Sequence, residues 1–288
     1  MSMAVADASQ SSCSSMVADI RLYAPDYEPH VQSERMLLSR GTLPAESRDS
    51  RGAYVAAALI PNPIWRKPSE SEQSMISSVD APNDRRFVAV LRLFGTQQLE
   101  SFRPSINSLW LMTREDERVF LHPLVVALLG RLKLYAHHTE RLQYTGLTFD
   151  PPGLETVSID ASRKYVGLHV DYWDRKPLSE RHSSPSRLCV NIGTESRHLL
   201  YMNVGLERMA VMLREANVEP AEEPAHLARQ FMSSFPAYPV IRLLIEPGEA
   251  YIAPTEYIIH DASSAEASGR TQHLAFRSDF RIQEIVHR

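Results

Sequence analysis

The sequence predicts a mainly β protein, a sandwich or barrel with flanking helices, and two observations support this prediction. From about residue 155, short runs rich in Val, Ile, Leu and aromatic residues alternate with turn residues. Closely spaced strands of this kind favour a sandwich or barrel over a βαβ fold. One interruption, 204–235, has helical periodicity and predicts one or two inserted helices. The predicted strands are LETVSID (154–160), YVGLHVDYW (165–173), RLCVNIG (187–193), RHLLYMN (197–203), VIRLLIEPGEAYIAP (240–254), TEYIIHDA (255–262) and TQHLAFRSDF (271–280).

The first half of the chain gives fewer signals. The alternating run RRFVAVLRLFG (85–95) predicts a strand. Residues 114–143 carry apolar side chains at helical spacing, with acidic residues first and basic residues later, which predicts the strongest helix of the chain. A short helix before Gly41 and loops to about residue 84 precede them. Residues 193–196 predict a hairpin turn between the runs 187–193 and 197–203.

Composition limits the class of protein. The 288 residues, 43% hydrophobic and 23% charged, are those of a globular chain, and a net charge of -4 offers no basic footprint for nucleic acid. No run approaches the roughly 20 apolar residues of a membrane helix. With only two cysteines, Cys13 and Cys189, the sequence does not predict a disulfide framework. We expect a reduced, cytoplasmic protein that acts on a small molecule without a nucleic-acid or membrane partner.

Domain organisation follows from the same patterns. Residues 1–18 form a Ser/Ala-rich stretch without the charged and apolar regions of a signal peptide, which predicts a disordered leader. Residues 19–288 are predicted to form a single domain, with its strand core at about 85–288 and the helical insertion at about 204–235. Whether this domain stays a monomer or forms a homodimer is left open by the sequence.

The stretch GLHVDYWDRK (167–176) places a histidine and an aspartate two positions apart. On a strand, residues i and i+2 project from the same face, so His169 and Asp171 can reach one point. Alone, such a pair is more often a polar patch than a metal site. His260, near the end of another predicted strand, supplies a third donor. Two histidines and one carboxylate on adjoining strands form the facial triad that binds non-haem Fe(II).

An arginine follows the last of these residues. Arg270 comes ten residues after His260, and a guanidinium grips a carboxylate with two parallel hydrogen bonds. Arg277, seven residues further on, competes for this role, but an odd spacing puts the two side chains on opposite faces of a regular strand. The spacing from His260 favours Arg270. A tight turn at Pro247 and Gly248 leads into the strand before His260.

This order of residues resembles the Fe(II)/2-oxoglutarate-dependent oxygenases, whose pattern is HxD, a distant His, and an Arg about ten residues beyond it. The resemblance covers roughly residues 85–288 and implies a double-stranded β-helix, a cupin-like jelly roll. It implies that His169, Asp171 and His260 hold Fe(II), and that Arg270 holds 2-oxoglutarate, with O2 as co-substrate. The Asp171 carboxylate is intact, which favours hydroxylation over halogenation. The long separation between Asp171 and His260 departs from compact members and is accounted for by the insertion.

Among subfamilies, the GLHVDxWD context and the long gap resemble the bacterial hydroxylases of free or N-substituted, such as N-succinyl, amino acids. This implies hydroxylation of an unactivated C–H of an amino-acid-like substrate. Two alternatives remain: desaturation or cyclisation on the same scaffold, and a non-catalytic, metal-binding cupin-like module, which would have no need of Arg270. Candidate substrate contacts are Trp173, Tyr172, Arg175 and Arg92, and further cations that could grip a substrate carboxylate are Arg187 and Arg197.

Overall fold

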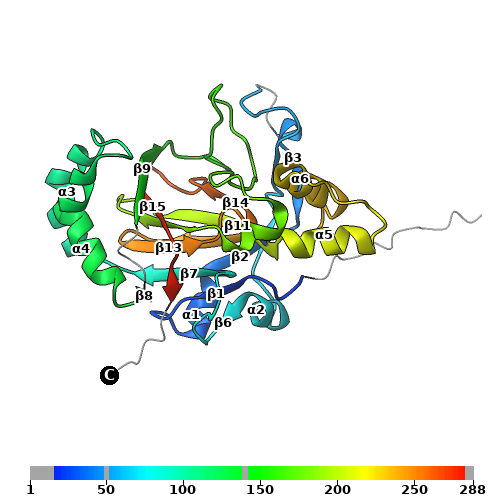
Figure 1. Cartoon of the computed structure of the whole chain (residues 1–288), viewed down its shortest axis with the longest axis horizontal. Helices are drawn as coiled ribbons and strands as arrows, with labels where there is room; N and C mark the ends of the chain where they lie inside the picture. The colour runs from blue at the N-terminus through cyan, green and yellow to red at the C-terminus, as the bar shows by residue number, and fades with distance from the viewer. Residues whose placement is uncertain (1–15, 49–51, 138–141, 283–288) are drawn as a thin grey trace, which may run out of the picture.

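Two β-sheets form the centre of the computed structural model, which describes residues 16–48, 52–137 and 142–282 (Figure 1). The larger sheet contains β6 (Ser77–Ser78), β1 (Arg21–Tyr23), β7 (Phe87–Arg92), β13 (Glu249–Ala253), β10 (Ser186–Asn191), β15 (Thr271–Ser278) and β9 (Gln143–Asp150), in that order. The smaller sheet contains β14 (Ile258–Ser263), β11 (Arg197–Gly205), β12 (Ile241–Ile245), β2 (Met36–Ser39) and β5 (Trp65–Arg66). Short pairs are formed by β3 (Thr42–Pro44) with β4 (Leu59–Pro61), and by β8 (Ala136–His137) with β16 (Arg281–Ile282).

The strands from β9 onward pair in a nested order. The outermost pair is β9 with β15, the next is the bridge of His169 to His260 in β14, then β10 pairs with β13, and β11 with β12 innermost. Nested pairing of this kind, divided between two sheets, is the jelly-roll arrangement. The predicted double-stranded β-helix is therefore confirmed.

Apolar side chains from both sheets meet in the main core. Val90 and Ala275 of the larger sheet belong to the same buried cluster as Leu199 and Leu243 of the smaller one, so the sheets pack face to face. A second cluster lies on the outer face of the larger sheet, where its outward side chains, such as Leu188, meet the flanking helices. Burying one face against the opposite sheet and the other against helices gives the larger sheet long apolar runs in place of a strict alternation.

The helices cover the outside of this core (Figure 1). On the larger sheet lie α3 (Thr96–Leu109), the 3-10 turn η2 (Glu117–Leu121) and α4 (Pro123–Leu132). The predicted helical insertion is confirmed as α5 (Leu206–Glu215) and α6 (Pro224–Ser234). The remaining short helices are α1 (Pro29–Glu34), α2 (Glu70–Ile76), η1 (Ala45–Ser47) and η4 (Leu178–Ser183). None of the helices in the described part of the chain is long and apolar enough to cross a membrane.

The predicted hairpin at 193–196 is wrong. β10 belongs to the larger sheet and β11 to the smaller one, so the turn between them crosses from sheet to sheet. The Asn191 side chain holds this turn: its amide donates to the carbonyl oxygens of Glu195 at 2.9 Å and Ile245 at 3.0 Å. The residues of the turn carry the same local signal in either arrangement, and the partners that decide between them are distant in sequence.

Further elements differ from the prediction. The helix expected over 114–143 begins only at Pro123, capped by the His122 side chain, and ends at Leu132; the chain then turns into β8, and residues 138–141 lie outside the described part. The runs 154–160 and 165–173 are irregular segments with isolated bridges rather than strands. Within the second run, Gly167 adopts φ +74° against the backbone of Leu59, which departs from extended strand geometry. The helix α3, with Pro104 inside it, was not predicted.

The N-terminal segment contributes more than loops. Strands β1 and β6 extend the larger sheet, and β2 and β5 the smaller one, so the sheets reach well before residue 85. The predicted leader 1–18 falls mostly on residues 1–15, outside the described part of the chain. Met16, at its end, is buried in the main core.

The turn before β13 depends on a glycine, which gives a stability prediction. Gly248 has φ +86°, and a Cβ there would lie 2.3 Å from the carbonyl oxygen of Phe94. We expect Gly248→Ala to lower the free energy of unfolding by at least about 2 kcal/mol, because it combines left-handed strain with a backbone clash. Gly130→Ala is the matched control: it lies inside α4 with open space around it, and should raise stability by about 0.5–1 kcal/mol. Equal stabilities of the two variants in urea unfolding would contradict this account.

Candidate metal centre

Three side chains from two neighbouring segments meet at one point inside the barrel. His169 and His260 exchange both backbone hydrogen bonds, at 3.0 and 2.8 Å, which fixes the two residues opposite each other. Asp171, two residues further along the extended segment, donates its N–H to the Thr255 carbonyl at 2.9 Å. The predicted same-face arrangement thus forms without a regular strand, because the single bridge and this hydrogen bond hold the segment extended.

The three side chains present their donor atoms to one another. The Nε2 atoms of His169 and His260 lie 3.6 and 3.7 Å from the two carboxylate oxygens of Asp171. Each Nδ1 faces a backbone carbonyl, that of Gly167 at 3.0 Å and that of Ile258 at 3.4 Å. Donating the Nδ1 proton to a carbonyl leaves the Nε2 lone pair directed at the centre, which is the tautomer that a metal ligand needs.

Burial and charge set the protonation of this group. Burial raises the pKa of Asp171, but His260, His169 and Arg187 together hold it well below its usual range, so the carboxylate is ionised. Burial lowers the pKa of His260 to about 3. Burial acts in the same direction on His169, but the nearby Asp171 and Asp261 carboxylates outweigh it and raise its pKa to about 9. A metal ion would therefore meet one anionic ligand and one neutral imidazole, and would displace a proton from the other.

The donor set fits a divalent transition metal. The ligand atoms of His169, Asp171 and His260 all lie within 4.8 Å of one another, and among the described residues this is the group of metal-ligating side chains with such a geometry. The Oδ2 atom of Asp171 is buried and has no hydrogen-bond partner among the described residues. An unsatisfied buried carboxylate oxygen is costly unless a cation completes it. Two imidazoles and one carboxylate suit Fe(II) and leave coordination positions open.

A cavity of about 500 Å3 adjoins the three ligands, large enough for a small organic molecule. Its lining is polar and charged, and includes the guanidinium groups of Arg114, Arg187 and Arg197. Arg187 lies near the metal ligands, with Nη1 3.6 Å from Asp171 Oδ2. The further residues of the lining are Thr148, Asp150, Val157, Ser158, Ile159, Val166, Tyr251, Asp261, Ala262 and His273.

The far part of this cavity holds a second charged group. Arg197, at the start of β11, contacts His273 Nδ1 and lies 3.4 Å from Asp150 Oδ2. Burial raises the pKa of Asp150, but His273 and Arg197 outweigh it, so the pKa is lowered and the carboxylate is charged. The Nε atom of Arg197 is buried without a hydrogen-bond partner among the described residues. The cavity thus offers a guanidinium with unused donor capacity away from the metal ligands.

The arginines expected beside the site take other positions. Arg270 is exposed in the loop before β15, and the residues that line the cavity, within the described part of the chain, do not include it. Arg277 is buried, but it pairs with Glu256 and with Asp174, at 2.9 Å from the latter. Arg92 stacks on the Tyr27 ring at 4.9 Å, on β7 and outside this cavity.

The other expected substrate contacts also lie outside the described lining of the cavity. Tyr172 is 53% exposed and stacks against Arg181, with 4.5 Å between the guanidinium carbon and the ring centroid. Trp173 lies between Arg114 and Arg277, 4.5 and 5.5 Å from their guanidinium carbons. Arg175 is exposed, with φ +53°.

Sequence reasoning missed several lining residues. The predicted helix 114–143 includes Arg114, and Asp150 ends a strand that the sequence patterns do not predict. Asp261 directly follows His260; its Oδ2 lies 3.7 Å from His169 Nδ1, and its Oδ1 accepts from the Ser158 hydroxyl at 2.9 Å. The sequence signal available for Asp261 was its place in the same predicted strand as a ligand. No local signal marks Asp150 or Arg114.

Of the comparisons with known proteins, only the one with solved structures found matches. No protein-family model matches this chain, and no curated protein matches it. HygX from Streptomyces hygroscopicus with iron bound is 16% identical, over 66% of this chain and 81% of that one, with a TM-score of 0.32. The Kdo hydroxylase KdoO, a non-heme Fe(II) alphaketoglutarate dependent dioxygenase, in complex with alphaketoglutarate and Fe(III), is 12% identical over 66% and 79% of the chains, with a TM-score of 0.33. At this level of similarity, the chemistry of the site must come from its own residues.

The geometry of the three ligands predicts the behaviour of a variant. We expect Asp171→Ala to weaken Fe(II) binding by more than about 100-fold, since replacing even an outer partner of a metal ligand costs 10–100-fold. Isothermal titration under anaerobic conditions measures this directly. Circular dichroism should show an unchanged fold, because the substitution also removes a buried carboxylate whose Oδ2 lacks a partner. Fe(II) binding equal to that of the unchanged protein would refute the triad.

Proposed function

We propose that this chain is an Fe(II)/2-oxoglutarate-dependent dioxygenase that hydroxylates an unactivated C–H of a small molecule. The observation that carries the proposal is the convergence of His169, Asp171 and His260 beside a cavity lined by arginines. A metal-binding module that served only stability would have no use for a charged cavity next to its metal. The reaction would convert a C–H bond, O2 and 2-oxoglutarate into C–OH, succinate and CO2.

When bound, iron supplies the activation of O2 that no protein side chain provides. The residues of this chain would hold and orient the reactants. His169, Asp171 and His260 would hold the ion, and a site with three protein ligands would have room for the keto-acid end of 2-oxoglutarate and for O2. With Asp171 as a ligand, chloride would lack the position at the metal that halogenation needs, which supports hydroxylation.

We propose Arg197 as the partner of the distal carboxylate of 2-oxoglutarate. Arg197 lies four residues along β11 from Tyr201, which pairs with His260, and four strand residues span about 13 Å. If 2-oxoglutarate bound the metal through its keto-acid end, its second carboxylate would lie several bonds from the ion. The cation that binds this carboxylate must therefore lie at a distance from the three metal ligands. Arg187, at 3.6 Å from Asp171, is too near the metal for this role. Arg270 was favoured by spacing, and its exposed position makes it the weaker candidate.

The proposed substrate is a free or N-acylated amino acid. A cavity of about 500 Å3 suits a molecule of this size beside 2-oxoglutarate. Arg187 lines it close to the metal ligands, and its Nε has no hydrogen-bond partner among the described residues. A guanidinium in that place would grip a substrate carboxylate and bring the adjoining carbon chain to the metal. The one cysteine in the described part of the chain, Cys189, is free and buried, in keeping with a reducing, cytoplasmic setting.

The first test is release of succinate. With Fe(II), ascorbate, O2 and 2-oxoglutarate, the protein should form succinate, and a panel of free and N-acylated amino acids should contain a member that stimulates this release and gains one oxygen by mass spectrometry. A gain of a double bond or a ring instead would indicate desaturation or cyclisation. No succinate above an Asp171→Ala control, with or without the panel, would favour the non-catalytic metal-binding module.

The second test separates the arginines. We expect Arg197→Gln to raise the KM for 2-oxoglutarate by about 10–100-fold, as for the loss of a charge-assisted hydrogen bond worth ~1.5–3 kcal/mol. Arg270→Gln, an exposed position, serves as the matched control and should leave this KM within a factor of two. A large rise in KM for Arg270→Gln with Arg197→Gln unchanged would return the role to Arg270.

A further inference from the structure

A network of charges lies beside the Asp171 segment, and its residues are not among the described lining of the cavity. Arg181, in η4, is 0% exposed, and Glu256, just before β14, is 1% exposed. The Nη1 atom of Arg181 lies 3.5 Å from Glu256 Oε2. Glu256 also pairs with Arg277, which in turn reaches Asp174 at 2.9 Å. Arg181, Glu256 and Arg277 are thus buried together, and Asp174, at the exposed end of the network, supplies the second anion.

Arg181 connects this network to a metal ligand. Its Nη1 donates to the backbone carbonyl of Asp171 at 2.7 Å, and its Nε donates to the carbonyl of Lys176 at 2.9 Å. The N–H of Asp171 donates to the carbonyl of Thr255, the neighbour of Glu256. Both the N–H and the carbonyl of Asp171 are therefore held. The N–H is bonded directly to the segment before β14, and the carbonyl is bonded to Arg181, which pairs with Glu256 of that same segment.

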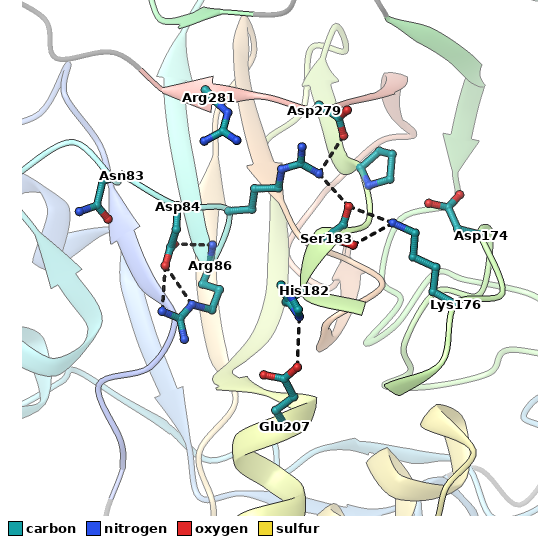
Figure 2. A pocket seen from close by; sticks show the side chains of 12 residues that line it. Asn83, Asp84, Arg86, Asp174, Lys176, His182, Ser183, Glu207, Asp279 and Arg281 are labelled. Carbon is teal, nitrogen blue, oxygen red and sulfur yellow. Dashed lines mark hydrogen bonds and ion pairs between the residues drawn. The ribbon is translucent and has the colours of Figure 1, made fainter. Parts of the chain in front are cut away.

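The network reaches the surface at a groove of about 820 Å3, which Asp174 and Lys176 line. Figure 2 shows the ammonium group of Lys176 bonded to Ser183, at 3.0 and 3.1 Å to its hydroxyl and carbonyl oxygens. These bonds close residues 176–183 into a loop, and the Arg181 side chain within it donates to the carbonyls of Lys176 and Asp171. Elsewhere in this groove Arg85 pairs with Asp279 and Arg86 with Asp84. The His182 ring lies 3.1 Å from a carboxylate oxygen of Glu207 (Figure 2).

We propose that Arg181 is a positioning residue for the metal centre: through the Asp171 carbonyl it fixes the orientation in which Asp171 presents its carboxylate to the ion. This inference rests on the proposed function. Burying a guanidinium and a carboxylate is costly, and replacing such a pair by apolar side chains is often neutral or favourable for stability. What an apolar residue could not do is hold two backbone carbonyls of the ligand loop at once. Arg181 does so with two donors of one rigid fork.

The test uses Arg181→Lys, which keeps the charge but loses the fork. The matched control is Arg35→Lys, far from the metal ligands. Arg35 is also buried, pairs with a 1% exposed glutamate, Glu249, donates to a backbone carbonyl, that of Leu244, at 2.9 Å, and stacks on a tyrosine, Tyr27, at 4.4 Å. The two substitutions thus remove similar interactions, and only one of them touches the metal segment.

The experiment measures the affinity of each full-length variant for Co(II) alone, by titration well below its melting temperature. The melting temperature of each variant is measured as well. Arg181→Lys should bind Co(II) about tenfold more weakly, the lower end of the loss seen when a partner of a metal ligand is replaced. Arg35→Lys should bind within a factor of two of the unchanged protein. Affinities that stay equal, or that fall equally in both variants, would overturn the positioning role.

A milder variant covers the case in which Arg181→Lys does not fold. Tyr172→Leu removes only the ring that stacks on Arg181, at a side chain 53% exposed. It should weaken Co(II) binding by about threefold, the loss of a modest cation–π contact, and an unchanged affinity in this variant would count against the role. If the unchanged protein itself fails to bind Co(II), the proposed function falls, which is a different result from equal affinities among the variants.

Discussion

The backbone bridge between His169 and His260 is the interaction on which the site depends. It joins the second and seventh segments of the nested barrel, and so places residues 91 positions apart in the chain opposite each other. An antiparallel pair that exchanges both hydrogen bonds has a fixed Cα separation and a fixed direction for its side chains. Two imidazoles are thereby brought together, although His169 lies on an irregular segment and only His260 lies on a strand. Asp171 then requires only an extended backbone for two more residues.

Charge compensation is the constraint that shapes the interior around this bridge. The described lining of the cavity contains three arginines and three aspartates, and the network beside the Asp171 segment contains two further cations with two anions. Buried charges persist only when paired. A bound Fe(II) ion and a dianionic 2-oxoglutarate would add charges that cancel, so the proposed ligands leave this balance intact. The unpartnered atoms of Asp171, Arg187 and Arg197 are the places where such charges would be received.

Much of the core was predictable because strand content and the HxD pair are local features. Short apolar runs identified most strands from β10 onward, and helical periodicity identified the insertion that forms α5 and α6. Sheet membership was not local: the turn at 193–196 carries hairpin signals, yet the distant partners of β10 and β11 separate them. Likewise, Pro123 interrupts a long apolar periodicity, and the strand β8 that follows α4 exists because β16 lies beside it.

The arginines illustrate the limit of spacing arguments most clearly. Odd and even positions separate the two faces of a strand only within that strand. Because β15 begins at Thr271, this rule does not apply to Arg270.

Within β15, His273 and Arg277 share a face. His273 lines the cavity, whereas Arg277 lies at the other end, where Glu256 and Asp174 neutralise it. A guanidinium already paired with two carboxylates has little remaining attraction for a third. The cavity instead receives Arg197 from β11, a strand of the opposite sheet. The end of β10 pairs with β15 at His273, and the turn after β10 crosses to the smaller sheet, so the start of β11 lies near His273. Which cation serves an anionic ligand is therefore decided by which cation the fold leaves incompletely paired, and that depends on contacts between distant segments rather than on distance along the chain.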